Sequence, residues 1–189
     1  MHPLLKSLTG GDRRSIGESN RAASLVLEQP ELIEVLVEGM ESADPVLRTR
    51  SADAMEKVTA VRPELLVPYK KKLLRKFSKV EQQEVRWHVA PMLARLPLSK
   101  TEETAVLNIL LSYTNDRSSI VKTMAMQALA DIALRSLRFL PEVQRHIEEL
   151  TATGTPAMKA RGKKLLKQLL KARQGIGERS SAPAGSQVV

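Results

Sequence analysis

Residues 121–133 read Val121-Lys122-Thr123-Met124-Ala125-Met126-Gln127-Ala128-Leu129-Ala130-Asp131-Ile132-Ala133. Apolar or small side chains stand at the first position and again four, seven, eight and eleven positions later. These positions form one face of an α-helix with 3.6 residues per turn. A basic residue, Lys122, directly follows the first apolar position. The stretch therefore predicts a helix that buries one face against neighbouring helices.

The same pattern occurs four times along the chain. The four segments begin at Leu47, Val85, Val121 and Met158 and close at Val58, Leu96, Ile132 and Leu169. Their first residues are 38, 36 and 37 positions apart. A second apolar residue lies 11 positions before each of them, at Leu36, Leu74, Leu110 and Ile147. Because one helical hairpin cannot bury both of its faces, the regular spacing predicts hairpins that stack on one another.

In these segments, and in the prolines Pro68 and Pro141 of the preceding helices, residues 30–172 resemble the HEAT-repeat family of armadillo-like proteins. The resemblance implies an all-α fold, an α-solenoid in which helical hairpins form a right-handed superhelix. In such repeats an acidic turn residue often pairs with a basic residue of an adjacent repeat. Asp44 and Asp116 occupy that place, whereas the second and fourth repeats have no obvious equivalent.

The pattern also predicts how the chain is divided. We expect a single domain over residues 1–172, with an N-terminal cap at 12–29 and four repeats at 30–172. Residues 173–189 are rich in Gly, Ser, Ala and Gln, and we expect them to form a disordered tail. Asp44-Pro45 and Thr155-Pro156 are typical helix starts, because the first residue can cap the helix and proline fits its first turn.

The composition excludes several classes of protein. The chain of 189 residues has no cysteine, so disulfides, thiolate metal sites and thiol nucleophiles are excluded. No two histidines have the spacing of metal ligands, and Gly10-Gly11 lacks the context of a phosphate-binding loop. We therefore expect no metal and no cofactor. No apolar run is long enough to cross a bilayer and no signal peptide is evident, so we expect a cytoplasmic protein without a membrane partner.

The net charge of +9 is concentrated in two regions. Residues 64–99 carry a net charge of +5 and residues 155–189 a net charge of +7. The candidate basic patch consists of Lys72, Arg75, Lys76, Lys79, Lys159, Lys163 and Lys167. The first four have the spacing of one helical stripe, and the last three recur every four residues. These side chains are interpreted either as solvated helix faces or as contacts to phosphate or another acidic partner.

The candidate partner-binding residues are Trp87, Arg86, Arg50 and Lys122. Trp87 is the only tryptophan, and on a helical wheel it lies about 200° from the buried position of Val85. The basic residue that follows each first apolar position (Arg48, Arg86, Lys122 or Lys159) has a second interpretation, namely hydrogen bonding between repeats. His88 is interpreted as a histidine at the edge of the core rather than as a catalyst.

We expect a non-catalytic scaffold or adaptor that presents a helical-repeat surface to a protein partner whose identity the sequence does not give. The alternative is a nucleic-acid-binding protein that contacts DNA or RNA through its basic helices. A third hypothesis is a DNA base-excision enzyme of similar helical build. Such an enzyme needs a carboxylate beside several aromatic side chains in a basic cleft. Because Trp87 stands alone and has no acidic residue four positions away, the sequence predicts no enzyme.

Overall fold

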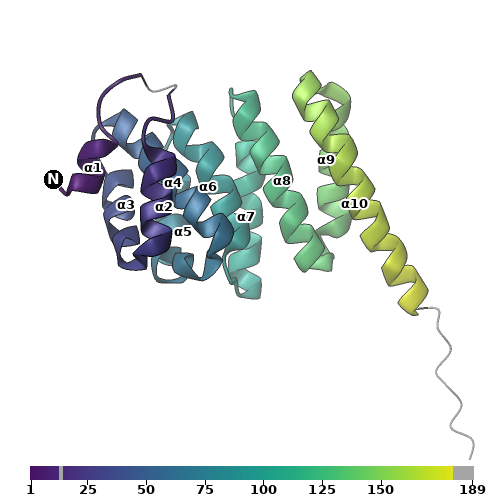
Figure 1. The fold of residues 1–189 in the computed structure, drawn as a ribbon. Helices are drawn as coiled ribbons and strands as arrows, with labels where there is room; N and C mark the ends of the chain where they lie inside the picture. Colours follow the sequence, from purple (N-terminus) through teal and green to yellow (C-terminus); the bar gives the residue numbers. More distant parts are fainter. Residues whose placement is uncertain (13–14, 181–189) are drawn as a thin grey trace, which may run out of the picture. The chain divides into compact units, whose positions relative to one another are not determined.

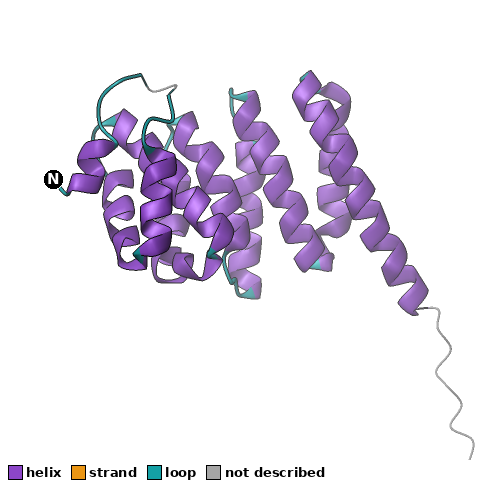
Figure 2. Cartoon of the chain, viewed as in Figure 1, coloured by secondary structure: helices purple, strands orange, loops and turns teal. Residues whose placement is uncertain are grey.

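Every regular element in residues 1–12 and 15–180, the part of the chain that this computed structural model describes, is a helix (Figure 2). The all-α fold class is thereby confirmed. The chain divides into two compact units, Met1–Ala128 and Leu129–Val189. The expected single domain over residues 1–172 stays a prediction. Within the same described ranges, no helix combines the length and the apolar composition needed to cross a membrane.

The described residues of the first unit form seven α-helices and the beginning of an eighth, with short 3₁₀ helices between them (Figure 1). The elements are α1 (Pro3–Ser7), α2 (Ser19–Glu28), η1 (Pro30–Leu32), α3 (Ile33–Met40), α4 (Pro45–Val61), η2 (Pro63–Tyr69), α5 (Lys70–Arg75), η3 (Phe77–Lys79), α6 (Gln83–Arg95), α7 (Lys100–Tyr113) and α8 (Ser119–Arg135). Helix α4 is the centre of this unit, because it packs against α2, α3 and α6.

The second unit begins inside α8 and continues through η4 (Leu137–Phe139), α9 (Leu140–Thr153) and α10 (Pro156–Ser180). Helices α9 and α10 pack closely on each other. Gly162 of α10 is the point of close approach, since a Cβ atom at this position would collide with the side chain of Thr151. The absence of a side chain at Gly162 therefore sets the distance between the two helices.

The predicted buried positions of the four segments are confirmed. The residues at the first, fifth, eighth and twelfth positions of every segment are buried: Leu47, Ser51, Ala54, Val58, Val85, Val89, Met92, Leu96, Val121, Ala125, Ala128, Ile132, Met158, Gly162, Leu165 and Leu169. The ninth position is buried in three segments and half-buried in the fourth, at Leu166. The predicted helix starts are also confirmed, because Asp44 accepts a hydrogen bond from the Val46 amide at 2.8 Å and Thr155 from the Met158 amide at 3.4 Å.

The basic stripe was predicted on one continuous helix over residues 70–79, and this prediction is wrong. Helix α5 ends at Arg75, and residues 77–79 form a 3₁₀ helix. Pro68 lies in the 3₁₀ helix η2 before it, where its missing amide hydrogen interrupts no α-helical ladder. As a result Leu73 and Phe77 are fully buried, whereas Leu74 is only half-buried.

Both ends of the chain differ from the prediction. Among the described residues of the expected cap at 12–29, the helix begins at Ser19, while residues 13–14 lie outside the described part of the chain. The short helix α1 was not predicted. Leu4, Leu5 and Leu8 anchor this N-terminal segment in the core. The predicted disordered tail is wrong for residues 173–180, because α10 runs to Ser180. No proline stops the helix there, and a glycine inside a helix costs only about 1 kcal/mol. Residues 181–189 lie outside the described part of the chain.

Candidate functional site

Arg50 of α4 holds the loop that precedes α2. Its side chain is buried, with 4% of the residue exposed. The guanidinium group donates hydrogen bonds to five main-chain carbonyl oxygens: Leu8 at 3.0 Å, Thr9 at 3.3 Å, Gly10 at 2.7 Å, Asp12 at 3.2 Å and Ser15 at 3.2 Å. Arg50 was predicted as a partner-binding residue, and this stays a prediction. In the structure its donors bind the loop.

Glycine is required where this loop approaches Arg50. Gly10 and Gly11 have φ of 76° and Gly17 has φ of 51°, in the left-handed region that other residues rarely adopt. A Cβ atom at Gly17 would also lie 2.7 Å from the guanidinium carbon of Arg50. The glycines therefore shape a loop whose carbonyl groups converge on one buried cation.

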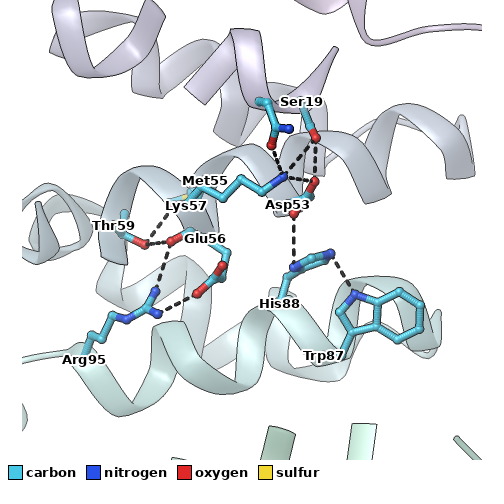
Figure 3. Close-up of polar contacts among 10 residues, drawn as sticks. Ser19, Asp53, Met55, Glu56, Lys57, Thr59, Trp87, His88 and Arg95 are labelled. Carbon is cyan, nitrogen blue, oxygen red and sulfur yellow. Dashed lines mark hydrogen bonds and ion pairs between the residues drawn. The ribbon is translucent and has the colours of Figure 1, made fainter. Parts of the chain in front are cut away.

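A polar cluster surrounds Asp53, one turn after Arg50 on α4 (Figure 3). Oδ2 of Asp53 accepts hydrogen bonds from the Ser19 hydroxyl at 2.5 Å and from Nζ of Lys57 at 2.7 Å. Lys57 also donates to the side-chain carbonyl of Asn20 at 2.6 Å. The second oxygen, Oδ1, lies 3.8 Å from Nδ1 of His88 on α6. The cluster thus connects α2, α4 and α6 through one carboxylate.

His88 is held between Asp53 and Trp87. The indole N–H of Trp87 donates to Nε2 of His88 at 2.7 Å, so Nδ1 carries the imidazole hydrogen and faces Asp53. The two rings meet edge to face, with their centroids 5.8 Å apart. Burial lowers the pKa of His88, and this effect exceeds the opposing influence of the Asp53 and Glu56 carboxylates. His88 is therefore neutral at neutral pH.

This lowered pKa predicts a pH-dependent stability. Below the unfolded-state pKa of about 6.5, the unfolded chain binds a proton at His88 that the folded chain resists. We expect the free energy of unfolding to fall as the pH decreases from about 6.5 toward the folded-state pKa, by about 1 kcal/mol per pH unit at the steepest point. Urea unfolding of the wild type and of His88→Gln over this range measures the effect.

At alkaline pH, His88 of the wild type is neutral in both the folded and the unfolded state. The difference in the free energy of unfolding between the wild type and His88→Gln at this pH is the reference for the comparison. The difference should shrink as the pH falls, because only the wild type loses this stability. If the free energies of unfolding of the two proteins differ by the same amount at every pH, down to the lowest pH at which both are folded, the assignment of a neutral, buried His88 is contradicted.

A cavity of about 140 Å³ lies beside the cluster. Its walls are Ser15, Ile16, Thr49, Arg50, Asp53, Trp87 and His88. A cavity of about 150 Å³ lined by apolar side chains is known to accept a benzene-sized molecule, so this one has room for one side chain of a partner. Two of the four predicted partner-binding residues, Trp87 and Arg50, thus border the same cavity.

The hydroxyl and imidazole groups of the cluster are engaged with other residues of the cluster. Ser19 is fully buried and donates its hydroxyl hydrogen to Asp53, so it is not placed to attack a substrate in the cavity. His88 has Nε2 occupied by Trp87 and Nδ1 directed at Asp53, which leaves neither ring nitrogen free for proton transfer to a bound molecule.

Arg86 and Lys122, the other two predicted partner-binding residues, belong to a ladder of polar contacts on a different part of the first unit. Arg48 belongs to the same ladder. Arg48 donates from Nε to the side-chain oxygen of Gln82 at 2.9 Å. Arg86 donates to Asp116 at 2.7 Å and to the main-chain oxygen of Val80 at 2.8 Å. These two arginines therefore connect parts of the first unit that are about 30 residues apart in the sequence, and the acceptor of Arg48 is the uncharged amide oxygen of Gln82.

Asp116 is the centre of the second step of this ladder. Burial raises its pKa, but hydrogen bonds from the Ser118 amide and Arg86 and the charge of Lys122 lower it more. Lys122 is half-buried, and it acts on the same carboxylate as Arg86. A wide depression of about 610 Å³ borders this pair, lined by Glu81, Gln83, Arg86, Asn115, Asp116 and Arg117. Its walls are polar groups of both signs.

The predicted basic residues are all exposed, but they differ in their neighbours. In the first unit, Lys72 and Lys76 share Glu41 at 3.1 and 3.2 Å. Burial raises the pKa of Glu41, and the two lysines lower it by a larger amount. The neighbouring Lys70 pairs with Glu102 at 2.9 Å. The charge of this part of the patch is therefore partly neutralised. Lys159, Lys163 and Lys167 of the second unit have no such partner in the part of that unit that is described.

Asp53, Lys57 and Ser19 were not predicted as parts of a site. The helical wheel of α6 showed no acidic residue beside Trp87, since the carboxylate that reaches this place comes from the neighbouring helix α4. One signal was available in the sequence. Asp53 is a charged residue next to the buried positions of Ala52 and Ala54, where burial of a carboxylate is costly unless it is paired.

Neither a family model nor a curated protein sequence matches the chain. Among solved structures, the crystal structure of an engineered protein is similar, with a TM-score of 0.61 and 18% sequence identity. The match covers 89% of this chain and 78% of that protein. A likeness at this level of identity shows a shared helical fold and carries no information on function.

Proposed function

We propose that the protein is a non-catalytic scaffold built from HEAT-like repeats, a right-handed α-solenoid that binds a protein partner. Two findings support the repeat architecture. The same positions are buried in four segments of nearly equal spacing. In addition, two arginines that follow the first buried residue of a segment bind a residue just before the next segment. Arg48 binds Gln82, and Arg86 binds Asp116.

The observation that carries the proposed binding function is the cavity beside Trp87. Asp53 and His88 of the polar cluster belong to its walls, and the side chains of both already have polar partners in the cluster. Ile16 and the half-buried Trp87 remain in its walls as apolar contact surface. Tryptophan is enriched among the residues that contribute most to protein binding, above all where a pocket excludes water. The expected occupant is an apolar side chain of the partner.

An affinity capture experiment with the full chain tests this proposal. Wild-type protein, Trp87→Ala and Ile16→Asp are compared by quantitative mass spectrometry of the proteins they retain from an extract. We expect a partner whose recovery falls at least about tenfold with both variants, which corresponds to about 1.4 kcal/mol of binding free energy. Ile16→Asp is the more specific variant, because it leaves the contacts of Trp87 with His88 intact.

Leu137→Ala serves as the matched control, because Leu137 is a similarly exposed apolar residue (44% exposed, against 53% for Ile16) in the other unit. Its retained proteins should equal those of the wild type. Thermal melting followed by circular dichroism confirms that each variant is folded. A set of retained proteins that is the same for all four folded proteins would refute the cavity as the binding site.

A further inference from the structure

We infer that the solvent-facing side of α10 is a second binding surface, which takes the phosphate backbone of a nucleic acid duplex without reading its sequence. This surface lies in Leu129–Val189 and is independent of the proposed protein-binding cavity in the first unit. The inference rests on the charge, the exposure and the spacing of the side chains along this helix.

The charge of α10 has one sign. Residues 156–175 contain seven lysine and arginine side chains and no aspartate or glutamate. All seven are exposed: Lys159, Arg161, Lys163, Lys164, Lys167, Lys171 and Arg173. Apart from Arg161, none of them has an ion pair with another residue in the part of the chain that the structure describes. Like charges four residues apart repel each other and lower the stability of the helix. An anionic partner would remove this loss of stability.

The lysines are arranged on one face. Met158, Gly162, Leu165 and Leu169 are the buried residues of α10. On a helical wheel, the five lysines fall within an arc of about 140° on the opposite side. From Lys159 to Lys171 the row extends about 18 Å along the helix axis. Because successive phosphates of one DNA strand are about 3.4 Å apart along the duplex axis, the row can contact about four or five phosphates.

Three other anionic partners fit this face less well. A helix that lies on a membrane needs an apolar face to insert, but the apolar face of α10 is buried. Within residues 156–175, whose side chains the structure describes, Leu170 is the only exposed large apolar side chain. A protein interface normally has apolar or aromatic anchors at its centre, which this face also lacks. Single strands are bound largely by stacking on aromatic rings, and residues 156–175 contain no Phe, Tyr or Trp. A duplex needs none of these features.

Fluorescence anisotropy with a labelled DNA duplex of about 20 base pairs, two turns of B-DNA, tests the inference on the full chain. With four or five phosphates contacted, the affinity should fall roughly 100- to 500-fold between about 50 and 200 mM salt. Duplexes of unrelated sequence should bind equally. Affinity that does not change with salt, or the absence of binding at the low salt concentration, would overturn the inference.

Two triple variants with the same change of charge locate the contact. Lys163→Glu, Lys167→Glu and Lys171→Glu together reverse the α10 face, whereas Lys72→Glu, Arg75→Glu and Lys79→Glu reverse the same number of charges on and next to α5. We expect at least a hundredfold loss of duplex affinity for the first protein and less than tenfold for the second. Equal losses would show that net charge, and not α10, determines binding, and would overturn the assignment.

If the glutamate variant of α10 does not fold, the corresponding variant with glutamine at these three positions replaces it, with at least a tenfold loss expected. Vesicles with anionic lipid and a polyglutamate chain complete the set of probes. Tighter binding of wild-type protein to either of them than to the duplex would assign the surface to a membrane or to an acidic protein instead. Because Trp87→Ala leaves α10 unchanged, it should retain duplex binding even if the protein-binding cavity proves wrong.

Discussion

Replacing Arg50 with alanine is expected to reduce the free energy of unfolding by about 3–5 kcal/mol, because the substitution leaves five converging carbonyl groups without their shared donor. For a chain of this length, such a loss lowers the melting temperature by about 10 °C. The loop from Leu8 to Gly17 should also become accessible to proteases, since five of its carbonyl groups lose the donor that they share. Thermal melting and limited proteolysis measure the two effects.

Arg50→Lys and Arg62→Ala complete this experiment. A lysine keeps the positive charge but has no planar fork of donors, so we expect it to recover only part of the lost stability. Arg62 forms an exposed ion pair with Glu64, and its replacement should leave the melting temperature unchanged. If Arg50→Ala melts within about 2 °C of the wild type, a shift expected from less than about 1 kcal/mol, then other contacts hold the loop and Arg50 is not its anchor.

Replacing Leu129 with aspartate is expected to abolish cooperative folding of the region around α8. Leu129 is fully buried in the middle of this helix. The substitution removes about 2 kcal/mol of apolar burial and places an unpaired carboxylate where water cannot solvate it, at a cost of several kcal/mol. Together these losses approach the whole stability of a typical domain. Circular dichroism during heating should show a broad, weakened transition.

Ile120→Asp is the matched control for this experiment, because it places the same carboxylate on the same helix at a residue that is 52% exposed. Its melting curve should resemble that of the wild type. A cooperative, wild-type melting curve for Leu129→Asp would mean that Leu129 is not a core position, and the alignment of the four segments would then be incorrect.

The helices and their buried faces could be predicted from local sequence, since both depend on spacing within one helix. Leu47, Val85, Val121 and Met158 are buried as predicted. The local spacing of apolar and basic residues did not predict that helix α5 ends at Arg75. There the 3₁₀ turn brings Phe77 into the core, a gain from tertiary packing that outweighs the helix propensity of the lysines around it.

The candidate site could be predicted only in fragments, because its parts are far apart in the sequence. Arg50 binds carbonyl groups about 40 residues earlier, and Asp53 meets Ser19 and His88 about 35 residues away on either side. Every residue has a main-chain carbonyl group, so the sequence does not show which of them accept hydrogen bonds from Arg50. Arg50 was therefore interpreted as a surface residue. Gln82 was overlooked for a related reason: its amide oxygen accepts from Arg48 as a carboxylate would, although it has no charge.

The dependence of the N-terminal loop on Arg50 affects the order of events during synthesis. Gly10 leaves the ribosome about 40 residues before the guanidinium group that binds it, which is about 2–8 seconds at typical elongation rates. Helix α1 has five residues and is too short to be stable by itself. Leu4, Leu5 and Leu8 consequently stay exposed during this interval and are available to chaperones. The segment around Gly10 therefore cannot take its final structure before α4, which carries Arg50, has been synthesised.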